Sequence, residues 1–156
     1  MADAYGKLTG KVGVCAVTRG PGATNASIGV HTAFQDSTPM LLLIGQVARD
    51  QVDREAFQEI DYRRMFGEMA KWVAQIDDAN RIPEYISHAF HVAQSGRPGP
   101  VVLALPEDML RDVVEVADAP CAKLVQASPS AAAMDEMRDR LSKAERPLLL
   151  VGGPTW

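Results

Sequence analysis

Short apolar segments that alternate with helical segments place the strongest constraint on the fold of this chain. Four largely apolar segments lie at residues 12–17, 39–44, 71–76 and 100–105. Runs of this kind are typical of strands buried between two layers of helices in a parallel sheet. Because helical segments separate the strands, we expect right-handed crossovers and a doubly wound, mostly parallel α/β sheet with helices on both faces.

Two of the segments between the strands have clear helical features. Residues 23–35 connect the first two strands, and Thr24 or Asn25 can cap this helix. Residues 83–94 carry an amphipathic stripe, and Pro83 suits the first helical position. The chain therefore predicts helices at both places.

The sequence also predicts a division into parts. Residues 1–111 form the first domain, whose sheet we expect to be incomplete. Residues 112–130 lack a helical stripe and contain many turn residues, which predicts a linker. Residues 131–156 are expected to begin a second α/β domain with one helix and one strand.

Both ends of the sequence look abrupt. Residues 1–8 resemble the second half of a helix, Ser128 can cap the helix after the linker, and residues 146–151 resemble a strand. One helix and one strand cannot bury both of their faces alone. We therefore interpret the chain as a piece of a longer protein that lacks its beginning.

Composition excludes several classes of protein. The 156 residues include 16 Lys and Arg and 20 Asp and Glu, and the net charge of −4 lacks the basic footprint of a nucleic-acid binder. No apolar run approaches the ~20 residues of a membrane span, and no signal peptide follows Met1. Cys15 and Cys121 are far apart, which indicates free thiols in a reducing cytoplasm.

The segment 18–25, Thr-Arg-Gly-Pro-Gly-Ala-Thr-Asn, lies between a predicted strand and a predicted helix. Its glycines let the backbone approach a ligand closely, at the strand end where open α/β sheets bind ligands. The segment matches neither the dinucleotide fingerprint nor the phosphate-binding loop. Spacing alone leaves a ligand loop and a purely structural turn as alternatives.

Other polar residues are equally open to two interpretations. Gln58 can point into a site while Phe57 anchors its segment to the core, or the whole carboxylate-rich segment can form a solvated face. Arg97 can meet an anion or simply be exposed in a turn. The three histidines do not have the spacing of metal ligands, so we expect no metal site at His31, His88 and His91.

Seven short motifs follow one another in a fixed order. They are Met-Ala-Asp-Ala-Tyr-Gly at 1–6, the segment at 18–25, Asp-Ser-Thr-Pro at 36–39, Gly-Gln-Val at 45–47, Ala-Phe-Gln-Glu at 56–59, Gly-Arg-Pro-Gly-Pro-Val at 96–101 and Leu-Pro-Glu-Asp at 105–108. Together they resemble the pyrimidine-binding domain of thiamine-diphosphate enzymes, and most closely the acetolactate synthase-like group. The resemblance covers residues 1 to about 111, and the end of the chain resembles the start of that family's central domain.

The resemblance implies a function. Such a domain holds the aminopyrimidine of thiamine diphosphate at a subunit interface, while a separate domain of the partner subunit holds the diphosphate and Mg²⁺. A family glutamate activates the pyrimidine, and the resulting ylid attacks a 2-oxo acid, which loses carbon dioxide before addition to a second carbonyl. The implied parent is thus a carboligase or decarboxylase, active as a homodimer or homotetramer.

The resemblance also implies site residues. The loop residues that pack near the pyrimidine are Pro21, Gly22 and Asn25. Gln58 reaches into the active site as the catalytic residue that this chain supplies and also contacts the cofactor, and Phe57 lies beside the substrate channel. Arg97 contacts FAD in members that retain this non-redox flavin.

The chain departs from the family pattern at several points. The activating glutamate belongs about half a dozen residues before Met1, so no glutamate of this chain inherits its role, and the Gly-Asp-Gly motif for diphosphate and metal is missing. Ala48 and Glu107 stand where many acetolactate synthases have proline and lysine. We therefore expect the chain alone to be inactive, and its exact 2-oxo acid stays open.

Two alternatives remain at this point. The chain can be a catalytically inert, stand-alone oligomerisation or interaction module derived from such a domain. It can also be an unrelated nucleotide-binding sheet. In the first case exposed sheet edges and apolar surface favour self-association, as they do in the truncated enzyme.

Overall fold

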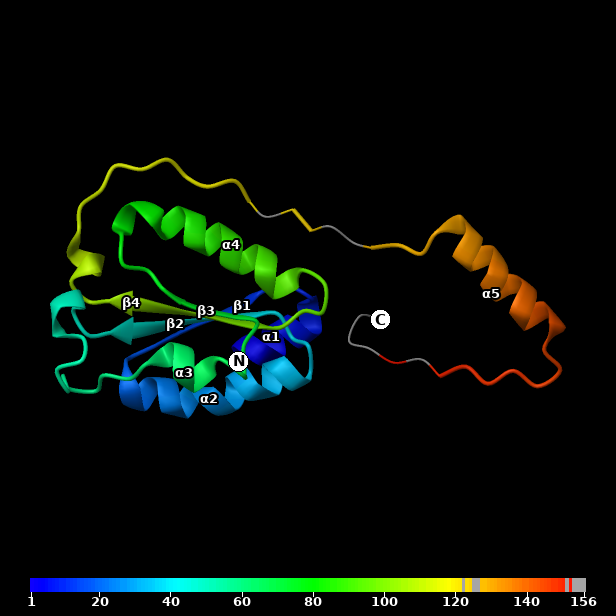
Figure 1. The fold of residues 1–156 in the computed structure, drawn as a ribbon, viewed down its shortest axis with the longest axis horizontal. Coiled ribbons are helices and arrows are strands. Elements are labelled where there is room, and N and C mark those ends of the chain that lie inside the picture. Colours follow the sequence, from blue (N-terminus) through cyan, green and yellow to red (C-terminus); the bar gives the residue numbers. More distant parts are fainter. Residues whose placement is uncertain (122, 125–126, 151, 153–156) are drawn as a thin grey trace.

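The first 106 residues contain one sheet of four parallel strands (Figure 1). The computed structural model describes residues 1–121, 123–124, 127–150 and 152. The strands are β1 (Gly13–Val17), β2 (Met40–Gln46), β3 (Trp72–Gln75) and β4 (Pro100–Pro106). Their order is β1-β2-β4-β3, and every pairing is parallel. The four strands predicted between residues 12 and 105 and the predicted α/β fold class are confirmed.

Helices cover both faces of this sheet. α2 (Gly20–Gln35) and the short α3 (Tyr62–Phe66) lie on one face, and α4 (Ile82–Gln94) lies on the other (Figure 1). α1 (Ala2–Thr9) packs beside β1. Single 3-10 turns lie at Arg49–Gln51, Ala79–Arg81 and Met109–Arg111.

Alternate residues of the central strands supply two separate cores. Leu42 of β2 faces α2 and α3, where it joins a core with Val30 and Phe66. Leu41 faces α4, where it joins a core with Ala89. Burial of each leucine contributes about 2 kcal/mol. Because both faces of the central strands are buried, their sequences are apolar throughout.

The starts of the two long helices agree with the sequence to different degrees. α4 has Pro83 in its first turn, as predicted. α2 begins at Gly20, three residues earlier than predicted, because Pro21 already supplies a helical φ in the first turn. Thr24 Oγ1 donates to the carbonyls of Gly20 at 2.9 Å and Pro21 at 3.0 Å. Thr24 and Asn25 are therefore inside the helix, and the prediction that they cap it is wrong.

The described residues of the segment 112–130 form no helix or strand. Residues 112–121 run along α4 (Figure 1). Ser87 Oγ on α4 donates to the Pro120 carbonyl at 2.8 Å, which attaches this segment to the helix.

α5 (Ala131–Lys143) follows this segment and buries none of its residues. Its cap is Ser130, whose Oγ accepts from Ala133 N at 3.2 Å, so the prediction of Ser128 as the cap is wrong. Residues 146–150 do not form the predicted strand, and residue 151 lies outside the described residues. A strand needs a neighbour for its backbone N–H and C=O groups, and the sheet does not include this segment.

Two expectations from composition can be compared with the structure. Among the described helices, none combines the length and the apolar character needed to cross a membrane. Cys15 and Cys121 are both free; Cys15 packs against the α2 and α3 core, and Cys121 is exposed.

Candidate functional site

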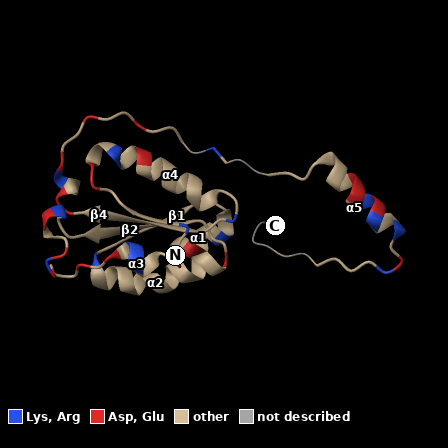
Figure 2. Ribbon diagram, in the orientation of Figure 1, with Lys and Arg blue, Asp and Glu red and all other residues tan. Residues whose placement is uncertain are grey.

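The loops that follow the parallel strands gather at one edge of the sheet, at the left of Figure 1. We call this the carboxyl edge, and the opposite side the amino edge. Charged residues are concentrated in the loops of the carboxyl edge, whereas α2 carries none (Figure 2). Open parallel sheets bind ligands at their carboxyl edge, so a site is expected there.

The predicted loop and the predicted glutamine meet at this edge. Gly20 has a φ of +24° and Gln58 a φ of +67°. A Cβ on Gly20 would lie 2.9 Å from the Gln58 carbonyl oxygen and 3.1 Å from the Gln58 Cβ. Because any larger residue would force the two segments apart, only glycine permits this contact.

The other predicted loop residues differ in their exposure to solvent. Gly22 is half-buried, and a Cβ there would lie 2.9 Å from Thr18 Cγ2. Pro21 and Asn25 are exposed. Within the part of the chain that the structure describes, the Asn25 side chain makes no hydrogen bond, so its amide is available to a ligand.

The loop that carries Gln58 has an unusual backbone. Asp53, Glu55 and Gln58 all have positive φ, at 63°, 55° and 67°. Each such position costs a non-glycine residue about 1 kcal/mol, and strain of this kind clusters at functional sites. The Glu59 carboxylate holds the loop, because it accepts from Asp53 N at 2.8 Å and Ala56 N at 3.2 Å. Glu59 is thus a structural residue rather than part of a solvated face.

Sequence reasoning missed Tyr62, which is only 3% exposed. Its hydroxyl accepts from Gly20 N at 3.0 Å and donates to the Gly45 carbonyl at 3.3 Å. Burial raises the pKa of Tyr62, so the hydroxyl keeps the proton that it donates. The Asp61 side chain caps α3 by accepting from the Arg63 and Arg64 N–H groups. In the sequence, Asp61 directly before Tyr62 is a typical N-cap, and it could have predicted that a helix begins at Tyr62.

Sequence reasoning also missed Gln46, a buried polar residue at the end of β2. Its Nε2 donates to the Ile60 carbonyl at 2.9 Å, and its Oε1 accepts from Val47 N at 2.9 Å. Gln46 therefore joins the end of the Gln58 loop to the central strand.

An open cleft of about 890 Å³ lies between this loop and the sheet. Val73 and Ala104 contribute apolar surface, and Gln58 and Tyr62 belong to its lining. Phe57, in contrast, is 79% exposed, so the prediction that it anchors its segment to the core is wrong. Most of the residues that line the cleft are polar or charged, so it offers more hydrogen-bonding groups than a typical, mostly apolar ligand pocket.

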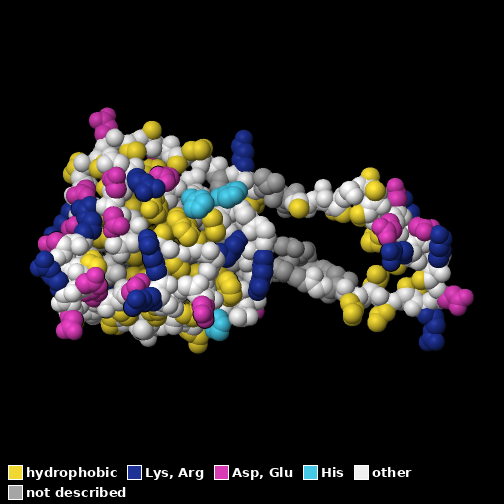
Figure 3. Space-filling view, viewed as in Figure 1, with side chains coloured by type: hydrophobic (Ala, Val, Ile, Leu, Met, Phe, Trp, Pro, Cys, Tyr) yellow, Lys and Arg dark blue, Asp and Glu magenta, His cyan; other side chains and the backbone are white. Residues whose placement is uncertain are grey.

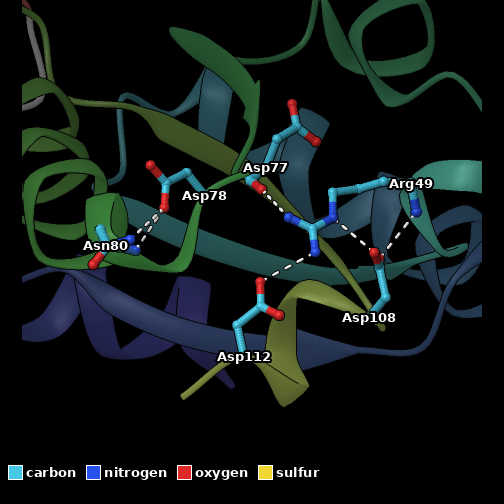
Figure 4. Close-up of polar contacts among 6 residues, drawn as sticks. All are labelled: Arg49, Asp77, Asp78, Asn80, Asp108 and Asp112. Carbon is cyan, nitrogen blue, oxygen red and sulfur yellow. Dashed lines mark hydrogen bonds and ion pairs between the residues drawn. The ribbon is translucent and has the colours of Figure 1, made fainter. Parts of the chain in front are cut away.

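Arg49 connects three strand ends beside the cleft (Figure 4). Its Nε donates to Asp108 Oδ2 at 2.7 Å and its backbone N–H to Asp108 Oδ1 at 3.0 Å. The other guanidinium nitrogens donate to the Asp77 carbonyl at 2.6 Å and the Asp112 carboxylate at 3.1 Å. Burial alone would raise the pKa of Asp108, but the hydrogen bonds and charge of Arg49 outweigh this effect and lower it.

The two departures from the family pattern also lie near this edge. Ala48 is half-buried after β2. Glu107 follows β4, and its Oε2 lies 3.4 Å from a guanidinium nitrogen of Arg19, which directly precedes Gly20. The carboxylate therefore offsets the charge of the arginine that precedes the Gly20 turn, in an exposed pair worth under about 1 kcal/mol.

Arg97 lies at the amino edge, just before β4, and so away from Gln58. Its Nε donates to Ser37 Oγ at 2.7 Å, and its other donor nitrogen binds the carbonyls of Phe34 at 3.0 Å and Gln35 at 3.1 Å. These bonds complete the end of α2. The structure thus brings Gln58 together with the Gly20 turn but not with Arg97.

Within residues 1–121, 123–124, 127–150 and 152, no three His, Cys, Asp or Glu side chains are arranged to hold a metal ion. The histidines over α4 lie at the surface (Figure 3). His88 packs edge-on against Trp72, with ring centres 4.6 Å apart, which gives it a packing role.

Comparison with known proteins adds to this geometry. Residues 1–65 match the model of the N-terminal TPP binding domain of thiamine pyrophosphate enzymes. The chain is 40% identical over 159 residues to a probable acetolactate synthase large subunit of Methanococcus aeolicus, covering 97% of this chain and 26% of that protein. It is 39% identical over 157 residues to the acetolactate synthase large subunit of Lactococcus lactis, covering 97% and 27%. The chain thus spans about a quarter of the length of these relatives.

Proposed function

The chain belongs to the acetolactate synthase-like thiamine pyrophosphate enzymes and carries their N-terminal binding domain; on this premise we propose that its carboxyl edge holds the aminopyrimidine of thiamine diphosphate. The observation that supports the proposal is the close approach of Gly20 to Gln58, which brings the loop and the glutamine together. The proposed binding residues are Pro21, Gly22, Asn25 and Gln58.

These residues suit a flat, polar heterocycle. Gly22 lets the first turn of α2 pack closely on the end of β1, because a Cβ there would lie 2.9 Å from Thr18 Cγ2 and 3.2 Å from Val17 Cβ. The pyrrolidine of exposed Pro21 offers an apolar surface. The amides of Asn25 and Gln58 can each donate and accept, which matches a ring that carries both an amino group and ring nitrogens. The bound cofactor would supply the carbanion chemistry, and this chain would bind and orient its pyrimidine.

For the whole protein we propose a carboligase or decarboxylase of 2-oxo acids. The support is that the relatives are named acetolactate synthases, and that about three quarters of their length lies outside the match. Diphosphate and Mg²⁺ would bind to that remainder. Phe57, which is exposed beside Gln58, would face the substrate channel. A flavin in contact with Arg97 would occupy a site separate from the aminopyrimidine.

We also propose that the chain functions as a homo-oligomer. β1 is an edge strand, and its Val14 is 51% exposed; Ile28 on α2 is 77% exposed. Apolar side chains on an open edge and on a nearby helix favour association. Sedimentation of the wild type and of Ile28→Lys tests this proposal, which predicts a loss of association in the variant. A wild type that stays monomeric at all concentrations would refute it.

The aminopyrimidine proposal can be tested with the two halves of the cofactor. We expect 4-amino-5-hydroxymethyl-2-methylpyrimidine to shift the amide resonances of Gly22, Asn25 and Gln58 in the ¹⁵N-labelled chain. The thiazole half, 5-(2-hydroxyethyl)-4-methylthiazole, should leave them in place. Gln58→Ala should weaken binding about fivefold, the typical effect of one lost hydrogen bond. Equal shifts with both halves, or shifts confined to the amino edge, would contradict the proposal.

A further inference from the structure

One hydroxyl group joins the segments that form the proposed site. Tyr62 at the start of α3 accepts from the N–H of Gly20, the first residue of α2, and donates to the carbonyl of Gly45 in β2. Gly20 and Tyr62 are 42 positions apart. The hydroxyl of α3 therefore links the start of α2 and the end of β2, through residues that lie 42 and 17 positions from Tyr62.

This hydroxyl satisfies a group that has no alternative inside the helix. The first N–H groups of an α-helix lack intrahelical partners, and the α2 cap residue supplies no side-chain bond. Gly20 is buried, so its N–H cannot turn to water instead. Tyr62 thus determines where the start of α2 lies relative to β2.

The ring of Tyr62 is itself fixed. It is almost fully buried, and its centre lies 6.4 Å from that of Phe66 in the same core. A rigid ring holds its hydroxyl at a constant distance from the sheet. Gly20 is in turn pressed against Gln58, with only 2.9 Å from an added Cβ to the Gln58 carbonyl oxygen.

We propose that Tyr62 is a positioning residue, whose hydroxyl holds Gly20 against Gln58 and thereby sets the geometry of the ligand site. The inference rests on the proposed function, because the ligand is the aminopyrimidine. Tyr62 acts through Gly20, because its hydroxyl is already engaged by Gly20 N and the Gly45 carbonyl. The ring of Tyr62 packs in the core, whereas its hydroxyl positions Gly20. One substitution that removes only the hydroxyl can therefore separate the two contributions.

The test uses Tyr62→Phe, which keeps the ring and removes the hydroxyl. Tyr85→Phe is the matched control, because Tyr85 stacks on Trp72 at 5.6 Å on the other face of the sheet. We expect the Gly20 amide proton to move upfield and to exchange about tenfold faster in Tyr62→Phe. The affinity for the pyrimidine half should fall about fivefold, while the folded fraction is unchanged. Tyr85→Phe should alter neither readout.

Each outcome decides the matter. An unchanged Gly20 amide in Tyr62→Phe overturns the inference, and so does a changed amide with unchanged affinity. If Tyr62→Phe does not fold, hydrogen exchange of the Gly20 amide in the wild type is the test. Rapid exchange of that amide in the folded wild type would exclude the hydrogen bond to Tyr62 and overturn the inference. If the wild type itself does not bind the pyrimidine half, the proposed function fails, and with it the ligand role of Tyr62. The Gly20 amide readouts then still show whether the hydroxyl holds the turn.

Discussion

The two edges of the sheet differ in how they satisfy their own polar groups. At the amino edge, Arg97 binds the last carbonyls of α2, and the Lys71 ammonium donates to Ser95 O at 2.6 Å and to Val92 O at the end of α4. At the carboxyl edge, three non-glycine residues of one loop adopt positive φ, against Ser37 at the amino edge, and an open cleft lies beneath this loop. Cations at helix C-termini are favourable, whereas left-handed backbone is unfavourable.

This difference separates stability from function. The amino edge closes the ends of both long helices with bonds from the chain itself, although Thr38 Oγ1 is buried there without a partner among the described residues. The carboxyl edge has strained backbone and side-chain amides that can form hydrogen bonds with a bound molecule. Substitutions at the amino edge should therefore change stability alone, and those at the carboxyl edge should change binding.

The largest effect is expected from Gly6→Ala near the amino edge. The new Cβ would lie 2.6 Å from Thr38 Cγ2 and 2.7 Å from the Pro39 carbonyl oxygen. Because the backbone cannot yield easily, we expect the free energy of unfolding to fall by about 3 kcal/mol. The matched control is Gly29→Ala in α2, where a Cβ meets nothing within 4 Å and a gain of about 1 kcal/mol is expected. Urea denaturation measures both, and equal effects would show that the close contact is absent.

The next largest effect is expected from Arg97→Met. It leaves the carbonyls of Phe34 and Gln35 without their donor, so we expect a loss of about 2 kcal/mol. Arg97→Lys should recover part of this loss, because it keeps the charge but not the planar fork. Thermal unfolding measures these changes. The affinity for the pyrimidine half should remain that of the wild type, and a weaker affinity would break the separation of the two edges.

At the carboxyl edge, Gln58→Gly should have the opposite effect: a gain in stability and a loss of affinity. Glycine relieves the φ of +67°, which should raise the free energy of unfolding by about 1 kcal/mol. Binding of the pyrimidine half should weaken about fivefold. Asp53→Gly, at a φ of 63°, is the control: it should give a similar gain in stability with no loss of affinity. Loss of affinity in both variants would indicate that loop rigidity, and not the Gln58 amide, matters.

The smallest effect is expected in the pH dependence of the free energy of unfolding at acidic pH. Because the folded pKa of Asp108 lies below its ordinary value of 3.8, its stabilising contribution is complete above that value and disappears as pH falls through the folded pKa. Asp108→Asn should therefore flatten the pH dependence of stability below about pH 5. The change is small because Arg49 and Asp108 remain accessible to water. An unchanged slope in denaturation curves at several acidic pH values would contradict it.

Most strands and helices could be predicted from the sequence, because local patterns of apolar and polar residues determine them. The strand at 100–105 is apolar on both faces, and α4 has both its stripe and Pro83. The described residues 146–150 of the strand predicted at 146–151 form no strand, for the complementary reason. An apolar run shows a tendency to form a strand, but the neighbouring strand that completes it is not a property of local sequence.

The candidate site was only partly predictable. The glycine loop at 18–25 and Gln58 were candidates from the residue pattern, and the resemblance assigned their roles. The contact of the Tyr62 hydroxyl with Gly20, in contrast, spans 42 positions. The Arg97–Ser37 bond joins positions 60 apart, and nothing near Arg97 in sequence indicates it. Interactions at such separations depend on the completed fold, so residue spacing does not reveal them.

The strand order β1-β2-β4-β3 has a consequence for biosynthesis. Met40 of β2 pairs with Pro100 of β4, so β2 has only β1 beside it until about 60 more residues have emerged from the ribosome. At ordinary translation speeds this delay lasts about 3 to 12 s, during which an apolar strand has an open side. Nascent chains halted before β4 should therefore be digested readily by protease, and those halted well past residue 106 should resist it.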